Sequence, residues 1–282
     1  MSKFFNETMK AWNAALALDG ADVATAQGPR QEKPPTVKAP TNDIGDACLV
    51  TAPKIDKPLA DLLHSRFCGS DALEAAEESY RALRTRLLRM RAARSLRSVV
   101  ITSSVQGEGK TLTALNLALS CAQLHEMRVL LVDGDVRTCG LTRTLGSPSG
   151  PGLSEVLVGE CDPAKAILAT DSRNLSVLSS GQASLPPAEL FASRRWQELL
   201  SWCNESFSLV IVDSPPVLNL ADVELITAAC DGVLMVVRAQ HTRRDVLRNA
   251  ARQIDTKKLL GMVYNAAAES HHNYQYAAIN EK

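Results

Sequence analysis

The sequence predicts an α/β fold built on a doubly wound, mostly parallel sheet, and two observations carry this prediction. Short runs rich in Val, Ile and Leu recur after residue 97 and alternate with longer helical runs. Strands that are apolar on both faces are typical of parallel sheets, because helices cover both sides of such a sheet. Ligands bind such sheets at the carboxyl ends of the strands, so the residues that follow each strand are the first candidates for a site.

The globular domain is expected to span residues 71–265. It begins with a helix over 72–93, on which Tyr80, Leu83 and Leu87 share one apolar stripe with Met90. Strands are expected at 98–102, 128–132, 174–178, 208–212, 232–238 and 259–264. Helices are expected between them at 110–124, 153–158, 188–203, 221–229 and 243–254.

The two ends of the chain are expected to be different in character. Residues 1–70 are predicted to be largely disordered, because six of the 13 prolines fall between Pro29 and Pro58 among polar residues. A stripe of Phe5, Met9, Trp12 and Leu16 predicts a short helix that docks on a membrane surface or a partner, or a weakly helical terminus. Residues 266–282 are predicted to be a flexible, tyrosine-bearing tail.

Composition narrows the class of protein. The formal net charge is zero, which gives no general attraction to nucleic acid or to anionic membranes. The seven cysteines form no C-x-x-C pair, and the N-terminus has no apolar signal region, so a reduced, cytoplasmic compartment is expected. No apolar stretch reaches the ~18 residues that a spanning helix needs.

The segment SSVQGEGKT, residues 103–111, predicts a phosphate-binding loop between a strand and a helix. Glycines let the backbone approach phosphate, Lys110 would reach the β- and γ-phosphates, and Thr111 would bind Mg²⁺. The first position of the G-x-x-x-x-G-K-[ST] pattern holds Ser104, so a glycine-rich turn with an incidental lysine is the alternative. The residues expected to contact the nucleotide are Gly107, Glu108, Gly109, Lys110, Thr111 and Leu112.

Three acids follow apolar strands. The run VLLVDGDVR carries Asp133 and Asp135, and the run LVIVDSPP carries Asp213. An acid at the end of a buried strand is costly unless it binds a metal or accepts hydrogen bonds. Beside a phosphate loop, three acids indicate an Mg²⁺ site together with a group that orients or deprotonates a nucleophile, although any single one could cap a helix.

With these three motifs in order, the chain resembles bacterial tyrosine kinases of the polysaccharide-export type over residues 74–265. The resemblance extends to NLSVLSSG, PPAELFAS, ADVELI and DGVLMVVR, and it implies the deviant Walker group of P-loop NTPases, which includes partition and division ATPases. It implies ATP and Mg²⁺ as cofactors and an adenine contact by Asn265. The implied catalytic residues are Lys110, Asp133, Asp135 and Asp213, and the implied metal ligands are Thr111, Asp133 and Asp213.

The segment EESYRALRTRL fits the family's E-x-x-R-x-x-R pattern through Glu78, Arg81 and Arg84. In the family this pattern builds the contact between subunits of a ring, whereas on its own it is typical of a solvated charged helix face. The tail offers Tyr274 and Tyr276 as phosphate acceptors, fewer tyrosines than many family members carry. Gln106 also stands where family loops often have proline.

The resemblance implies an ATP-dependent protein-tyrosine autokinase that regulates exopolysaccharide or capsule biosynthesis and export, phosphorylating its tail in trans within a homo-oligomeric ring. It implies a cytoplasmic protein that a separate membrane chain-length regulator recruits to the inner face of the membrane and activates. A phosphotyrosine phosphatase is a further implied partner.

Three other functions are open alternatives. A nucleotide-dependent regulator of polysaccharide export that transfers no phosphate would fit the sparse tyrosine tail. A partition or positioning ATPase shares the fold, but its loop usually has a second lysine where this chain has Val105. Nucleic-acid binding by the arginines of residues 81–97 is not expected, because acidic residues adjoin them and only Tyr80 could stack on a base.

Overall fold

The computed structural model describes residues 55, 59, 70–146, 150–182, 184–218 and 221–266. All of these belong to one compact unit, residues 42–282. The expected docking helix around Trp12, the proline-rich segment and the tail tyrosines Tyr274 and Tyr276 lie outside the described residues. Among the helices within these ranges, none combines the length and the apolarity that crossing a bilayer requires.

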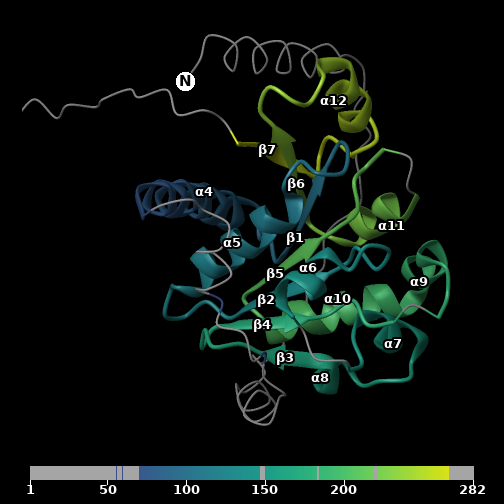
Figure 1. Ribbon diagram of the computed structural model, residues 1–282. Helices are drawn as coiled ribbons and strands as arrows, with labels where there is room; N and C mark the ends of the chain where they lie inside the picture. The colour runs from purple at the N-terminus through teal and green to yellow at the C-terminus, as the bar shows by residue number, and fades with distance from the viewer. Residues whose placement is uncertain are drawn as a thin grey trace, which may run out of the picture. The chain divides into compact units, whose positions relative to one another are not determined.

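Seven strands form one sheet in the order β3-β4-β2-β5-β1-β6-β7, with β3 antiparallel to β4 and every other pairing parallel (Figure 1). The expected doubly wound, mostly parallel sheet is therefore confirmed. The strands are β1 (Ser98–Ser103), β2 (Val129–Asp133), β3 (Ile167–Ala169), β4 (Leu175–Leu178), β5 (Leu209–Asp213), β6 (Gly232–Arg238) and β7 (Leu259–Asn265).

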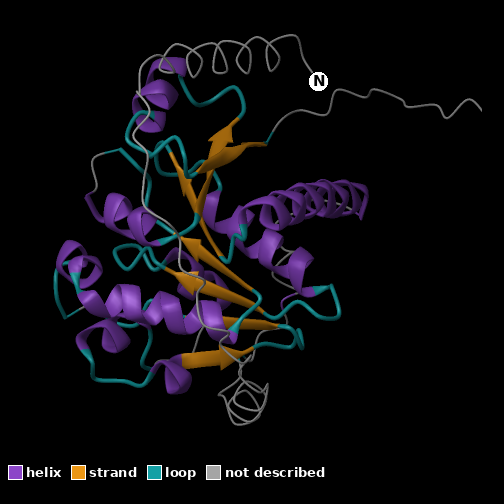
Figure 2. Ribbon diagram, turned by 180° about the vertical axis from the view of Figure 1, so that it is seen from behind, coloured by secondary structure: helices purple, strands orange, loops and turns teal. Residues whose placement is uncertain are grey.

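Helices cover both faces of the sheet (Figure 2). They are α4 (Ser70–Arg94), α5 (Lys110–Ala122), α6 (Gly140–Leu145), α7 (Leu153–Val158), α8 (Pro163–Ala166), α9 (Pro187–Ala192), α10 (Arg194–Ser206), α11 (Ala221–Ala229) and α12 (Arg244–Ala251). Each face has its own apolar core. Alternate residues of β1 serve the two cores, Val100 the first and Ile101 the second, as the two-residue period of a strand requires.

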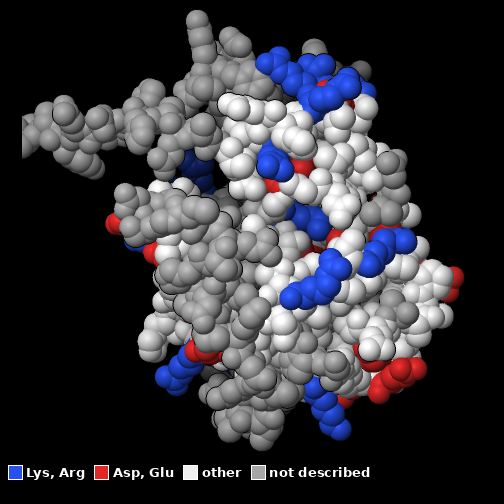
Figure 3. All heavy atoms as spheres, in the orientation of Figure 1, with Lys and Arg blue, Asp and Glu red and all other residues white. Residues whose placement is uncertain are grey.

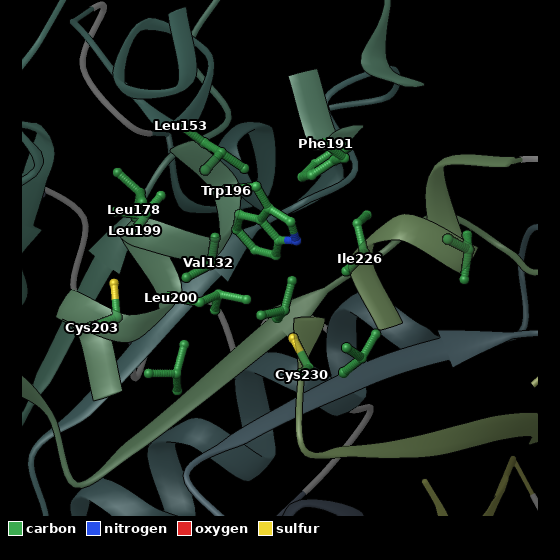
Figure 4. Packing of buried hydrophobic residues seen from close by; sticks show 14 of the residues in the cluster. Val132, Leu153, Leu178, Phe191, Trp196, Leu199, Leu200, Cys203, Ile226 and Cys230 are labelled. Carbon is green, nitrogen blue, oxygen red and sulfur yellow. The ribbon is translucent and has the colours of Figure 1, made fainter. Parts of the chain in front are cut away.

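The first core lies under α7, α9, α10 and α11, and Trp196 is its largest buried side chain (Figure 4). Its indole meets the ring of Phe191 edge to face, with ring centroids 5.2 Å apart. The second core lies under α4 and α5, where Leu87 and Leu115 are almost wholly buried. Burial on both faces explains why the strands read as continuous apolar runs.

The structure differs from the expected elements in four short places. The helix expected over 188–203 is two helices, α9 and α10, because the backbone at Ser193 is extended (φ −67°, ψ 148°). The antiparallel edge strand β3 and the helices α6 and α8 were not expected. Each has six residues or fewer, which is too short for a periodic apolar pattern.

Two residues ahead of the expected start of the domain also contribute to its core. The Ile55 amide donates to the carbonyl of Ala169 at 3.0 Å, which continues the sheet edge beyond β3, and the Leu59 amide donates to Asp171 Oδ2 at 3.1 Å. Both side chains are buried in the second core. Ile55 therefore lies against the outer side of β3.

Candidate active site

The expected phosphate loop connects β1 to α5 at the carboxyl edge of the sheet. Gly107 (φ 85°) and Gly109 (φ 94°) both adopt left-handed backbone angles, which a side chain would strain. Gly109 is the N-cap residue of α5, and within the described residues no side chain caps the amides of that first turn. These amides and the positive end of the helix dipole are therefore available to a phosphate.

The side chain of Glu108 braces the loop from inside. The residue is fully buried, its Oε2 accepts from the Val105 amide at 3.0 Å, and its Oε1 accepts from the hydroxyl of Thr242. The carboxylate is thus engaged within the protein, which leaves the backbone of Glu108 for the expected nucleotide contact. Thr242, which follows β6, was not predicted as part of the site.

The last residue of β7 closes over the same loop. Asn265 Nδ2 donates to the carbonyl of Glu108 at 2.9 Å, and a side chain at Gly109 would collide with that Asn265 amide. The structure therefore brings Asn265 to the loop, while its contact with adenine stays a prediction. Leu112 lies half-buried in the first turn of α5 and accepts a 2.7 Å bond at its carbonyl from Asn116.

The three predicted acids gather beside this loop. Asp133 and Asp213 are register partners at the ends of the adjacent strands β2 and β5, and both are fully buried. Asp135 is 1% exposed, and its Oδ2 lies 3.1 Å from Lys110 Nζ in a buried ion pair. One lysine and three carboxylates from three separate segments therefore meet at one point.

The hydrogen bonding of these acids is incomplete. Asp133 Oδ2 accepts from the amide (2.8 Å) and the hydroxyl (2.6 Å) of Thr142 in α6, whereas Asp133 Oδ1 has no partner among the described residues. Neither oxygen of Asp213 makes a hydrogen bond of normal geometry within the described part of the chain. Buried polar atoms without partners are rare, because each one loses its hydration without compensation.

Burial also shifts the titration of these groups. Burial raises the pKa of Asp213 to about 7, and the nearby Lys110 charge and the Thr111 hydroxyl oppose that rise. Burial raises the pKa of Asp133 as well, against the two bonds from Thr142. Without a compensating cation, both carboxyl groups therefore resist ionisation more than an exposed aspartate does.

These residues fit a divalent cation for which the protein supplies only some of the ligands. The unpartnered carboxylate oxygens of Asp133 and Asp213, with the neighbouring Thr111 hydroxyl, are the hard oxygen ligands that Mg²⁺ prefers. Within the described ranges, no group of three or more His, Cys, Asp or Glu forms a complete metal cage. In Mg²⁺ sites of phosphoryl-transfer proteins, phosphate oxygens and water commonly supply the remaining ligands.

The E-x-x-R-x-x-R strip lies apart from these acids on α4. Arg81 pairs with Glu77 at 3.4 Å and with Glu78 at 3.2 Å on its own exposed helix face. Arg84 instead turns toward α5, where its Nη1 donates to the carbonyl of Ser120 at 2.5 Å and to Gln123 at 3.4 Å. Two of the three predicted contact residues are therefore open to a neighbour, and the third holds α4 on α5.

A second charged surface covers α12, where basic side chains gather (Figure 3). Arg243 pairs with Asp245 at 2.8 Å, and Arg244 and Arg248 are exposed on the same helix. After β2, Arg137 Nε lies 2.7 Å from the buried Asp222 Oδ2 at the start of α11. That ion pair fixes the chain just after Asp135.

Known proteins share this arrangement. A family model described as an AAA domain matches residues 96–259. Tyrosine-protein kinase YwqD of Bacillus subtilis is 34% identical over 198 residues, covering 70% of this chain and 83% of the relative. Tyrosine-protein kinase CpsD of Streptococcus pneumoniae serotype 4 is 32% identical over 196 residues, covering 68% and 85%.

Solved structures agree with these relatives. The kinase domain of the Escherichia coli tyrosine kinase ETK superposes with a TM-score of 0.63 at 28% identity, covering 70% of this chain and 79% of that one. The family model's match, residues 96–259, includes the strands that carry the loop, Asp133 and Asp213. The chain has the fold of a P-loop NTPase and belongs to the family of bacterial tyrosine-protein kinases.

Proposed function

We propose that this kinase transfers the γ-phosphoryl group of ATP to tyrosines of its own C-terminal tail, in trans within a ring of identical subunits. One observation carries the proposal: buried carboxylate oxygens that have no partner among the described residues lie beside Lys110 and the N-terminus of α5, which no side chain of those residues caps. Such a site is suited to polyphosphate and a divalent cation, because each supplies the charge that the other lacks.

The chain's own residues would bind and orient ATP. The amides of residues 107–111 would receive the β- and γ-phosphates, and Lys110 would exchange its contact with Asp135 for the transferring group. Thr111, Asp133 and Asp213 would hold Mg²⁺, which neutralises charge on the phosphates when it is bound. Asn265 would contact the adenine from the end of β7.

Release of Lys110 would leave Asp135 free to act on the nucleophile. The tyrosine oxygen forms a bond to the γ-phosphorus, the bond from that phosphorus to the β,γ-bridging oxygen breaks, and ADP leaves. The phenolic proton passes to a carboxylate, for which Asp135 and Asp133 are the candidates. A phenol has a pKa near 10, so the carboxylate is effective only when the site also stabilises the developing phenolate.

We place this activity in the control of exopolysaccharide or capsule synthesis and export. The ring would form through Glu78 and Arg81, which are exposed on α4. A separate membrane chain-length regulator would recruit this cytoplasmic protein and activate it, and a phosphotyrosine phosphatase would reverse the reaction. The relatives support the kinase activity, and the open face of α4 supports the oligomer.

The direct test is to incubate the purified full-length protein with Mg·ATP and to map phosphorylated residues by mass spectrometry. Lys110→Met should abolish phosphorylation, because the lysine charge at the transferring phosphate is lost. Lys165→Met is a matched control, because Lys165 is exposed on α8, away from the phosphate loop. Phosphorylation of a folded Lys110→Met protein at the wild-type rate would contradict the proposed site.

A Tyr274→Phe, Tyr276→Phe double variant tests the acceptor. Most phosphotyrosine should disappear while ATP binding stays unchanged. If the double variant carries as much phosphotyrosine as wild type, the acceptor lies elsewhere, and Tyr264, which is 50% exposed, is the next candidate. If neither protein carries phosphotyrosine when a membrane activator is present, a regulator that transfers no phosphate replaces the kinase for this chain.

A further inference from the structure

The Asp133 carboxylate is held by a residue that no sequence motif identified. Thr142 donates twice to Asp133 Oδ2, through its amide at 2.8 Å and its hydroxyl at 2.6 Å. Two donors on the same oxygen fix both the position and the rotation of the carboxylate. Asp133 Oδ1 is then the atom without a partner among the described residues, next to Asp213 on the adjacent strand.

Thr142 is itself fixed from the other side. The Ser180 amide donates to Thr142 Oγ1 at 3.0 Å, and the Ser180 hydroxyl lies 3.1 Å from the same oxygen. Because Thr142 Oγ1 accepts from the Ser180 amide, its own proton is directed toward Asp133. The series of hydrogen bonds therefore runs from Ser180, after β4, through Thr142 in α6, to Asp133 at the end of β2.

Ser180 belongs to a segment that is clamped to α7. Ser154 donates to the Ser180 carbonyl through its hydroxyl at 2.7 Å and its amide at 3.0 Å. Glu155 accepts from the Gly152 amide at 2.7 Å and from the Gln182 amide at 2.9 Å. Both Ser154 and Ser180 are buried, so water does not compete for these bonds.

We propose that Thr142 is a positioning residue for phosphoryl transfer: it reserves one oxygen of Asp133 so that the other is presented to the nucleotide's phosphates and their cation. The inference rests on the proposed function of the site, and it extends that site to Ser180 and the segment after β4. Thr142 touches no reacting atom and acts only through Asp133. A carboxylate free to rotate would spend less time in the productive orientation, and turnover would fall accordingly.

Thr142→Val tests this inference, because valine matches the shape of threonine and removes only the hydroxyl. We expect kcat for Mg·ATP-dependent phosphorylation to fall about tenfold to a hundredfold, as loss of a hydrogen bond to a charged group predicts. The KM for ATP should stay within about twofold, since the loop that binds the nucleotide is unchanged. Thr142→Ser should restore most of the turnover because it restores the hydroxyl.

Thr144→Val is the matched control. Thr144 lies on the same short helix, and its hydroxyl donates to the Gly140 carbonyl at 2.8 Å rather than to Asp133. We expect wild-type turnover from this variant. An equal loss in Thr144→Val and Thr142→Val would overturn the proposal, because it would assign the effect to α6 as a whole.

A double-mutant cycle with Asp133→Asn separates positioning from general stability. If Thr142 acts through Asp133, then Thr142→Val should cause no further loss in the Asp133→Asn background. A loss of the same size in both backgrounds would overturn the proposal. Should valine disturb the fold, as thermal unfolding would reveal, Thr142→Ala carries the same cycle.

Binding of a fluorescent ADP analogue at increasing Mg²⁺ concentrations gives a readout that needs no turnover. Thr142→Val should raise the half-saturating Mg²⁺ concentration severalfold and leave Mg²⁺-free binding of the analogue unchanged. An unchanged Mg²⁺ dependence would overturn the inference. If the wild-type protein phosphorylates no tyrosine, the proposed function fails while this titration still decides the role of Thr142.

Discussion

Asp213 and Asp231 lie at opposite ends of the strands of the same sheet, and their carboxylates differ in hydrogen bonding. Asp231 precedes β6 at the amino edge, and its Oδ2 accepts from the Arg97 amide, the Ser98 amide and the Ser98 hydroxyl at 2.8–2.9 Å. Asp213 ends β5 at the carboxyl edge, is fully buried, and makes no normal hydrogen bond within the described residues. The exposed carboxylate is thus well bonded, and the buried one is not.

This contrast separates a structural acid from a functional one. At Asp231, three protein donors engage one carboxylate oxygen, and the group joins the start of β1 to the start of β6. At Asp213, burial removes water and the Thr111 hydroxyl and the Lys110 charge compensate only in part, so the carboxylate raises the free energy of the empty protein. Such a cost is expected at a site that a cation and phosphates complete.

The largest difference between the two aspartates is expected in phosphorylation, when each is replaced by asparagine. For Asp213→Asn, we expect phosphorylation to fall about 10²- to 10⁴-fold, because an amide cannot supply the charge that holds Mg²⁺ on the phosphates. Phosphotransfer measured with radiolabelled ATP at saturating Mg²⁺ checks this. Asp231→Asn is the control and should stay within about threefold of wild type. Comparable losses of phosphotransfer in both variants would contradict the distinction between a functional and a structural acid.

The pH dependence of unfolding should sharpen the contrast next. Because the pKa of Asp213 is about 7 in the folded protein and 3.8 ordinarily, the folded state binds more protons between these values. Its contribution to stability therefore declines as pH rises from about 4 to 7 and is constant above that range. Asp213→Asn should remove this decline and stabilise the nucleotide-free protein at pH 8 by about 1–3 kcal/mol.

Urea unfolding of wild type and Asp213→Asn at several pH values gives that comparison. Saturating Mg·ADP should flatten the wild-type decline, since a cation beside Asp213 favours the ionised carboxylate. Equal pH profiles for the two nucleotide-free proteins would show that Asp213 is better solvated than its burial indicates.

Asp231→Ala should change the free energy of unfolding by a smaller amount than Asp213→Asn and in the opposite direction, because Asp231 has a structural role. Three donors at the start of β1 lose their acceptor, and water replaces it only in part because Ser98 is buried. We expect a loss of about 1–2 kcal/mol in the free energy of unfolding, with ADP affinity unchanged. Urea unfolding and ADP titration measure the two quantities, and a change in ADP affinity would contradict a purely structural role.

The smallest effects are expected for the exposed acid and arginine of α4. Glu78→Ala with Arg81→Ala should leave the free energy of unfolding within about 1 kcal/mol, because exposed ion pairs contribute little. The same pair should shift the oligomer toward monomer in light scattering. Arg84→Ala should instead destabilise the fold, since Arg84 bonds to α5. Destabilisation by the first pair alone would assign all three residues to packing.

The sequence predicted the fold and several residues that the structure brings together, but it did not predict Thr142, Thr242 or the orientation of these side chains. Strands β1, β2 and β5 were predictable to within one residue, because burial on both faces leaves an unbroken apolar run that ends in a polar residue. The break at Ser193 has no glycine or proline to mark it. The burial of the Glu108 side chain and the hydrogen bonds from Thr142 to Asp133 depend on contacts between segments that local sequence spacing does not encode.

The bond from Asn265 to the Glu108 carbonyl has a kinetic consequence for the tail that follows it. It anchors the root of the tail at the nucleotide loop, nine residues before Tyr274 in the sequence. Nine residues span at most about 30 Å, so the acceptor is expected to lie within about 30 Å of the loop. Transfer within one subunit would proceed at a rate per molecule that is independent of protein concentration. Transfer between subunits would be second order until the ring assembles and first order afterwards. The initial rate per molecule, measured over a dilution series, therefore distinguishes transfer within one subunit from transfer between subunits. Asn265 anchors the tail and so determines how far the acceptor tyrosine reaches in either route.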